Sequence, residues 1–345
     1  MSKLRGLFDE QERLSKLSKK KDVLEQLNSH IDFEFFRKPL NNFFEKERTA
    51  ESNKGGRPAY DYIMMFKILI LQRYYNVSDD AIEYAILDRL SFMRFLGLGI
   101  NDAVPDAKTI WLFRDKLTKG HVIEKLFKHL DKQLDKDGII VHKGKLVDAS
   151  IVEVPIQRNN REENKSIKEG EIPAEWEENK LRQKDTDAQW VTHNGKNYFG
   201  YKNHVKADSK TKLITGYKVT TASVHDSEMI GQLVTKKEDG GQPLYADSAY
   251  RSETIEQMCQ QKGIESQIHE KGYRNKPLSK RQKQRNRKKS KVRARVEHIF
   301  GFMTHSMNEM YLRYRNLKRN TTGIGLMNIT YNLFRLMQLN IELTA

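Results

Sequence analysis

The segment Lys145-Leu-Val-Asp-Ala-Ser-Ile-Val-Glu-Val154 is the one around which this chain is organised. Its apolar residues recur with a period of two between Gly144 and Pro155, which predicts a β-strand. Asp148 lies in the middle of that strand, where a carboxylate loses its hydration unless a cation or hydrogen-bond donors compensate. Asp148 is therefore either an ion-paired structural residue or a metal ligand, and the rest of the sequence must distinguish the two.

The composition indicates a large, basic protein with a polyanionic partner. A chain of 345 residues can bury a large core and is expected to form two domains. Its net charge of +16 and pI near 9.6 favour nucleic acid as that partner. Cys259 is the only cysteine, which excludes disulfides within the chain and cysteine-based metal sites.

Neither a membrane-spanning segment nor a membrane-binding helix is expected. The longest apolar run is interrupted by Lys67 and is too short to cross a bilayer. No long basic amphipathic helix is present, and Met1-Ser-Lys-Leu-Arg5 leads into charged residues instead of a signal peptide. We therefore expect a cytoplasmic, nucleoid-associated protein.

Residues 1–136 are predicted to form an all-α DNA-binding domain. Ser78 and Asp106 are good helix N-caps, and Lys54-Gly-Gly-Arg-Pro58 is a plausible linker. Several short helices with tight connections suit a helix-turn-helix-like module, with a helical packing domain that makes no groove contacts as the alternative. The expected helices lie in residues 1–50, 62–74, from 78, 90–96, 106–117 and 121–135.

Residues 137–345 are predicted to form a second, α/β domain. The order strand, hairpin, helix, strand, helix, strand, helix favours a mixed sheet flanked by helices. A polar insertion with little core of its own is expected at 156–196. The other expected elements are strands at 145–154, 198–205, 213–221, 243–250 and 264–268, and helices at 226–234, 252–263, from 291, and 324–339.

A basic arm covers residues 271–295. It contains thirteen Lys and Arg residues and no acidic residue. Because its charges repel one another and it has few apolar anchors, we expect it to be mobile before DNA binds. A run this dense is better explained by phosphate binding than by a solvated loop.

Three carboxylates carry the predicted chemistry. Asp148 and Asp247 lie in apolar strands and are followed by small residues, and Glu297 lies beside the apolar stripe of a helix. Such a set could hold two Mg²⁺ ions roughly 3.5–4 Å apart, one activating the attacking water or 3′-hydroxyl and one stabilising the leaving oxygen. The alternatives are an ion pair within the sheet for Asp148, the start of a turn for Asp247, and an ion pair with Arg293 for Glu297.

The three acids and their contexts resemble the DDE transposases of bacterial insertion sequences, specifically the insertion-sequence-five type. The similarity covers most of the chain. It is carried by Gly56-Arg-Pro58, Trp190, Asn197-Tyr-Phe-Gly-Tyr-Lys-Asn-His204, Thr220-Thr-Ala-Ser-Val-His-Asp226, Tyr245-Ala-Asp-Ser-Ala-Tyr250, Arg293-Ala-Arg-Val-Glu-His298, Arg313-Tyr-Arg315 and Asn332-Leu-Phe-Arg335.

This resemblance implies an RNase H-like catalytic domain that depends on Mg²⁺, with Mn²⁺ as a substitute. The enzyme would bind the terminal inverted repeats of its own element in double-stranded DNA, cut there, and join the freed 3′ ends to target DNA. Bringing two ends together implies a homodimer on DNA. The rival functions are a catalytically silent DNA-binding protein and a nuclease of the same fold that cuts without joining.

One part of the family signature departs from the expected pattern. In related transposases the last acid lies in Tyr-x2-Arg-x3-Glu-x6-Lys, whereas this chain has Ser290 and Thr304 at the Tyr and Lys positions. Lys291 or Arg295 could then hold the terminal phosphate. His225-Asp226 ends a strand near the expected site, where the histidine is more often structural. The predicted DNA contacts are Arg57, Lys202, Lys288, Lys289, Lys291, Arg293 and Arg295.

Overall fold

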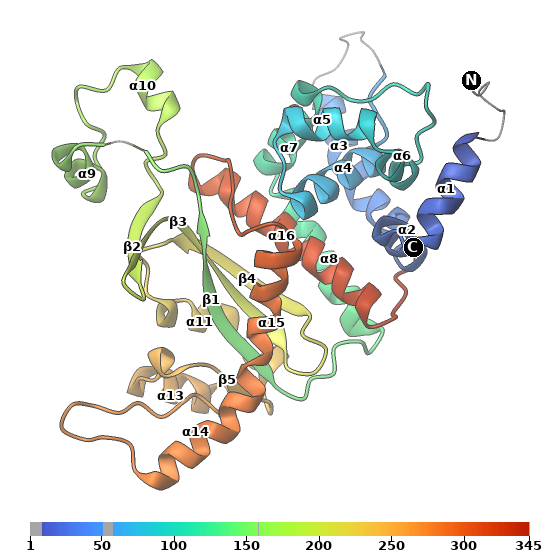
Figure 1. The fold of residues 1–345 in the computed structure, drawn as a ribbon. Helices are drawn as coiled ribbons and strands as arrows, with labels where there is room; N and C mark the ends of the chain where they lie inside the picture. The colour runs from blue at the N-terminus through green and yellow to red at the C-terminus, as the bar shows by residue number, and fades with distance from the viewer. Residues whose placement is uncertain (1–8, 51–57, 158, 345) are drawn as a thin grey trace. The chain divides into compact units, whose positions relative to one another are not determined.

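A computed structural model describes residues 9–50, 58–157 and 159–344. The chain divides into two compact units (Figure 1). One contains the residues up to Lys128 and those from Ile329 onward, and the other contains His129–Asn328. The expected linker at 54–57, with Arg57, falls outside the described residues.

The first unit is all-helical, as predicted. Its central helix is α4 (Tyr62–Tyr75), ten of whose fourteen residues are buried. Asp61, Ser78 and Asp106 each accept a hydrogen bond from a backbone N–H at a helix start, because the first turn of a helix leaves its donors unpaired. The other elements are α1 (Asp9–Lys19), α2 (Val23–His30), η1 (Phe33–Phe36), α3 (Arg37–Ala50), α5 (Asp79–Asp88), α6 (Leu90–Leu96), α7 (Ala107–Lys119), the start of α8 (Val122–Lys136) and the end of α16 (Leu317–Gln338).

The second unit is built on one mixed sheet. The strands lie in the order β2-β3-β1-β5-β6. β4 pairs with the same edge of β3 as β2 does, further along that strand. β1 is antiparallel to β3 and parallel to β5, and β5 is parallel to β6. This RNase H-like arrangement confirms the predicted α/β fold. The strands are β1 (Lys145–Glu153), β2 (Gln189–His193), β3 (Lys196–Asp208), β4 (Ile214–Thr221), β5 (Pro243–Tyr245) and β6 (Glu265–Ser266).

Helices flank this sheet and complete its core. Val147 and Leu244 of two neighbouring strands pack in one buried cluster with Ile230 of α11 and with Ile255 and Cys259 of α13. The elements that follow the first strand are α9 (Arg161–Lys168), α10 (Glu178–Gln183), η2 (Asp226–Glu228), α11 (Ile230–Leu233), α12 (Lys236–Asp239), η3 (Ser248–Tyr250), α13 (Glu253–Gln261), α14 (Lys280–Arg293), α15 (Arg295–Gly301) and the π-helical turn η4 (Phe302–Ser306).

The polar segment at 156–196 contains two short helices, one strand and a small packing centre. Trp176 is buried, and its indole Nε1 donates to Glu163 Oε1 at 2.7 Å. The Lys180 ammonium lies 2.8 Å from the same oxygen and also lies over the Trp176 ring. Trp176 therefore packs within this segment.

Residues 280–293 of the basic arm form the helix α14. α14 begins with a capping box in which the side chains and backbone N–H groups of Ser279 and Gln282 bond reciprocally. Arg285 makes two contacts of 2.7 and 3.1 Å with Glu270, and Lys289 Nζ donates to the Ile268 carbonyl at 2.9 Å. Glu270 lies one residue before the charge run, so an acid just outside the run holds the arm in place.

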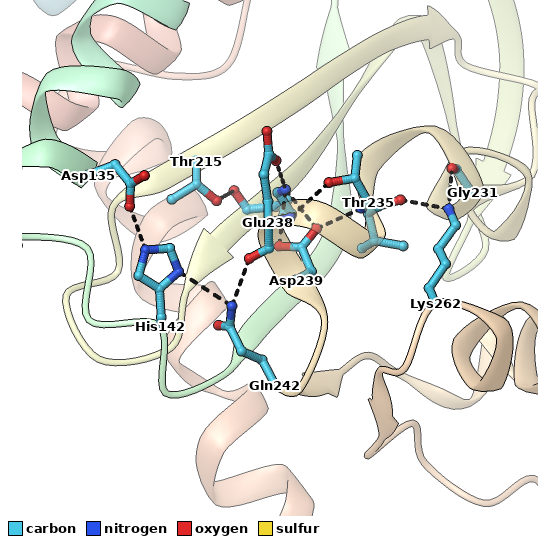
Figure 2. Close-up of polar contacts among 11 residues, drawn as sticks. Asp135, His142, Thr215, Gly231, Thr235, Glu238, Asp239, Gln242 and Lys262 are labelled. Carbon is cyan, nitrogen blue, oxygen red and sulfur yellow. Dashed lines mark hydrogen bonds and ion pairs between the residues drawn. The ribbon is translucent and has the colours of Figure 1, made fainter.

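A polar network ties the helices after β4 to the sheet (Figure 2). Lys206 of β3 is buried, and its ammonium lies 2.9 Å from Glu238 and 3.0 Å from Asp239 of α12. Asp239 also accepts from the Thr235 N–H at 2.8 Å. Because a charge removed from water must be paired, this network fixes the position of α12 on β3.

Asp131 of α8 lies at the edge of this network without a hydrogen-bond partner for its buried Oδ1 among the described residues. Burial raises the pKa of Asp131 to about 7. The positive charges of Lys206 and Lys145 oppose this rise, and the negative charges of Glu238 and Asp135 add to it. The folded protein therefore prefers the protonated form of this carboxyl group.

We expect Asp131→Asn to stabilise the protein above pH 7. A carboxyl group whose pKa is raised by folding contributes stability that is lost as pH rises through the folded pKa. The gain should be up to about 4 kcal/mol at pH 8 and should vanish near pH 4. Urea unfolding of both proteins across that range measures it. A gain that is equal at every pH would show that the titration of Asp131 is not its cause.

Gly200 allows β1 and β3 to approach each other, and its replacement by Ala should separate them. A Cβ atom at this position would lie 2.2 Å from the Val152 carbonyl oxygen of β1. We expect a loss of about 2–4 kcal/mol in unfolding free energy, measured by urea denaturation. Gly231→Ala in α11 is the matched control, because its Cβ would meet only Met258 at 3.8 Å. Equal effects of the two changes would contradict the steric explanation.

Candidate active site

Asp148 lies on the central strand β1, opposite Val205 of β3. One carboxylate oxygen accepts from the Ala149 N–H at 2.9 Å, and the other lies 3.1 Å from Arg293 Nη1. Burial raises the pKa of Asp148 to about 6. The negative charges of Asp247 and Asp226 raise it further, whereas the Ala149 N–H and Arg293 oppose the rise. Negative charge is thus concentrated around a partly desolvated carboxylate.

Asp247 lies just beyond a strand, whereas we predicted it within one. β5 ends at Tyr245, and Asp247 caps η3 by accepting from the Ala249 N–H at 2.8 Å. The turn that we considered as an alternative is therefore present. Asp247 nevertheless lies close enough to Asp148 for its charge to raise the pKa of that residue. The structure brings together Asp148, which lies within β1, and Asp247, which follows the end of the parallel strand β5.

Glu297 lies on α15, and its side chain is 64% exposed. Its Oε1 lies 3.2 Å from Arg293 Nη2, so the ion pair that we considered as an alternative is also formed. Since Arg293 Nη1 contacts Asp148, one guanidinium bridges the acid of the strand and the acid of the helix. Val296 and Ile299 of the expected apolar stripe are buried beneath Glu297.

The residue types fit a hard divalent cation, although no closed metal site is formed. Within the described ranges, no group of three or more His, Cys, Asp or Glu side chains is arranged to hold a metal ion. The observation that favours a cation is Arg293, whose single positive charge already draws Asp148 and Glu297 together. Carboxylate oxygens are the donors that Mg²⁺ prefers.

The residues predicted to contact DNA fall into two groups. Four of them already make contacts within the protein. Lys202 Nζ lies 2.8 Å from Asp226, and Arg295 Nη1 donates to the Ser209 carbonyl at 2.6 Å. The other two are Lys289 and Arg293. Lys288 and Lys291 are exposed on α14. Arg57 lies outside the described residues.

Beside Asp148 lies a cavity of about 530 Å³ that the sequence did not indicate. Its wall includes Ala149, Ser150 and Ile151, the three residues of β1 that follow Asp148. Lys202 and Thr304 also line the cavity. Thr304, which occupies the Lys position of the family signature, therefore faces the same space as Lys202 of β3. The remaining lining residues are Glu153, Val191, His193, Tyr198, Asp226, Glu309, Met310 and Tyr311.

Tyr250 is a second feature that sequence analysis missed. Its side chain is 1% exposed, and its hydroxyl has no hydrogen-bond partner in the part of the chain that is described. Burial and the negative charges of Asp148, Asp226 and Asp247 hold its pKa well above the ordinary value. The only signal in the sequence was its position three residues after Asp247, at the end of η3.

Two protein-family models match this chain. Residues 12–116 match the model of a family described as transposase domain (DUF772), and residues 141–333 match the model described as transposase DDE domain. A similar solved structure is that of piggyBac transposase in a synaptic complex with hairpin DNA. The two chains share 13% identity with a TM-score of 0.46, over 89% of this chain and 74% of the other. No described helix is long and apolar enough to cross a membrane.

Proposed function

We propose that this chain, which belongs to the transposase DDE domain family, recognises the terminal inverted repeats of its own element. The family match confirms the resemblance found in the sequence and makes the chain a transposase, an enzyme that cleaves and transfers DNA. The proposal adds that it cuts at the repeats in double-stranded DNA and joins the freed 3′ ends to target DNA. A homodimer would bring the two ends of the element together.

Asp148, Asp247 and Glu297 are the proposed ligands of two Mg²⁺ ions, with Mn²⁺ as a substitute. When bound, such ions supply activation of the attacking oxygen and charge stabilisation of the leaving oxygen. The observation that carries this assignment is the Arg293 guanidinium, on which the carboxylates of Asp148 and Glu297 already converge. Asp148 is oriented by the Ala149 N–H and Asp247 by the Ala249 N–H, so both hold one rotamer at little further entropic cost.

Arg293 has a second role in this proposal. If its carboxylate partners held a divalent cation, its guanidinium would be free to contact a phosphate of the bound DNA end. Arginine suits that exchange because its planar fork binds carboxylate and phosphate oxygens in the same bidentate way. The switch would couple cation binding to the gripping of DNA.

α14 is the proposed path for the DNA backbone. Nine of its fourteen residues are Lys or Arg, and none is acidic. The residues that dock the helix and those that are exposed occupy different sides. With 3.6 residues per turn, the six exposed cations other than Arg285, which pairs with Glu270, fall within an arc of about 160°. These exposed cations are Lys280, Arg281, Lys283, Arg287, Lys288 and Lys291.

The proposed chemistry is tested with a labelled duplex that carries one element end, in the presence of Mg²⁺. We expect Glu297→Gln to abolish both cleavage and joining while DNA binding is retained, because the amide keeps the shape and loses the charge. Glu162→Gln, on the exposed first turn of α9, is the control and should remain active.

Each other outcome identifies a different function. If the Glu297→Gln protein still cuts, Glu297 does not belong to the catalytic set. If the natural protein binds the duplex without cutting it, the silent DNA-binding alternative replaces the transposase. If it cuts without ever joining, the activity is that of a nuclease.

The exposed cations of α14 should contribute to DNA affinity through phosphate contacts. For Lys288→Gln with Lys291→Gln we expect the slope of log K against log salt to decrease by about 2, equally for all DNA sequences. Lys289→Gln is the matched control on the same helix, because Lys289 already donates to the Ile268 carbonyl, and its slope should barely change. Equal effects of the two variants would argue against the proposed DNA-facing side.

A further inference from the structure

Two helices of the first unit carry large apolar side chains that face water. Tyr84 and Leu87 of α5 are 69% and 63% exposed, and Trp111 and Leu112 of α7 are 39% and 44% exposed. Exposed apolar residues are normally scattered singly over a protein surface, whereas a group of them rimmed by polar residues marks a site of interaction. These two helices are therefore candidates for a docking surface.

The four side chains belong to neighbouring helices, because α5 and α7 pack side by side (Figure 1). Arg114 in the middle of α7 forms an ion pair of 2.6 Å with Asp79 at the start of α5. Glu83 in the middle of α5 accepts a hydrogen bond of 2.7 Å from the backbone N–H of Ala107, at the start of α7. The two helices are thus antiparallel.

Each helix adds charged residues of one sign to its exposed side. Because a helix turns by 100° per residue, the exposed apolar and charged residues of each helix lie within an arc of about 100°, opposite its buried side. We call these residues together the α5–α7 surface. They are Asp80, Tyr84, Leu87 and Asp88 of α5, and Lys108, Trp111, Leu112 and Lys119 of α7.

The charge of this surface disfavours DNA as its partner. α5 contains four acidic residues and neither Lys nor Arg, whereas a surface that binds DNA draws most of its affinity from cations at the phosphates. A membrane is disfavoured as well, because helices that lie on membranes carry Lys and Arg on their polar side. Exposed aromatic residues between charged ones are typical of a contact between proteins.

The distribution of charge identifies a second copy of this chain as that protein. Two chains of net charge +16 repel each other, so they can associate only where opposite charges meet. On these helices the four acids of α5 nearly balance the four cations and one acid of α7. In a two-fold contact the surface meets itself, so α5 packs either on α5 or on α7 of the second copy. Only the second arrangement places acids against cations.

We propose that the α5–α7 surface is a contact between two copies of this chain, in which each α5 lies on α7 of the other copy. This inference rests on the proposed function, because it names a surface for the homodimer expected there. Tyr84 and Trp111 would be its central anchors, since buried aromatic residues carry much of the binding energy of interfaces. The charged residues would form the rim and fix the orientation of the two copies.

Paired charge reversal tests both the surface and its orientation. The oligomeric state of the full-length chain is measured by analytical ultracentrifugation without DNA, over a range of concentrations. We expect the natural chain to form a dimer, and Asp88→Lys and Lys108→Glu each to raise its Kd at least about 10-fold, because each change sets like charges against one another twice. An equal mixture of the two variants should form the dimer again, because both contacts then join opposite charges.

Both changes suit the folded chain. They place Lys in the last turn of α5 and Glu in the first turn of α7, where the helix dipole favours these charges. Tyr84→Ser with Leu87→Ser removes apolar area instead and should raise the Kd by about 10- to 100-fold. Ile172→Ser, at a site 56% exposed in the other unit, is the matched control and should leave the dimer unchanged. Thermal unfolding shows that each variant folds.

The outcomes separate this inference from the function on which it rests. If the natural chain is a dimer that neither the charge reversals nor the two serines weaken, the homodimer stands and its contact lies elsewhere. If the serines leave the dimer intact and lower the affinity for DNA, the surface binds DNA and the inference is wrong. A natural chain that is a monomer at every concentration also overturns it. A dimer that follows the predicted pattern but never cuts an element end would retain the contact and remove the transposase function.

Discussion

The burial of a negative charge in the middle of a sheet is the constraint on which the rest of the site depends. Asp148 is held by β1, which pairs along its whole length with β3 and at its start with β5. A carboxylate in this position is costly unless positive charge is supplied from outside the sheet. Arg293 supplies it from α14, so the electrostatics of one residue position a helix that lies 145 residues away in sequence.

This constraint also explains why the proposed catalytic acids differ so much in exposure. Asp148 and Asp247 take their positions from backbone groups within one or two residues, whereas Glu297 takes its position only from Arg293. A site that combines two rigid donors with one mobile donor can adjust to its ligand without disturbing the sheet.

The sequence predicted the elements of the fold better than their ends and contacts. The strand around Asp148 was predictable because apolar alternation reports directly on burial. Asp247 was placed in a strand because its neighbours are apolar, yet β5 pairs with β1 at only Leu244 and Tyr245 and then turns. Pairing registers depend on partners far away in the chain, and local composition does not contain that information.

Two contacts illustrate the same limit. Lys202 was predicted to contact DNA, and without DNA its ammonium lies against Asp226, because β3 runs next to the strand that leads to η2. The basic arm was expected to be mobile because its charges repel one another and it has few apolar anchors, and the contact that this composition did not indicate is the ion pair of Arg285 with Glu270, just outside the run. The charge pattern of a short stretch of sequence predicts a segment that binds polyanions. It does not predict the single contact that holds this segment in place.

α14 has a consequence for the energetics of the whole protein. None of its residues is buried, so its docking relies on a few hydrogen bonds and ion pairs. Elements with little apolar burial open at a free energy far below that of global unfolding. The helix that carries the densest positive charge is thus a cooperative unit of its own. Because Arg293 lies in its last turn, opening of this helix would also withdraw the guanidinium from Asp148 and Glu297, so that the grip on DNA and the charge balance of the catalytic centre would change together.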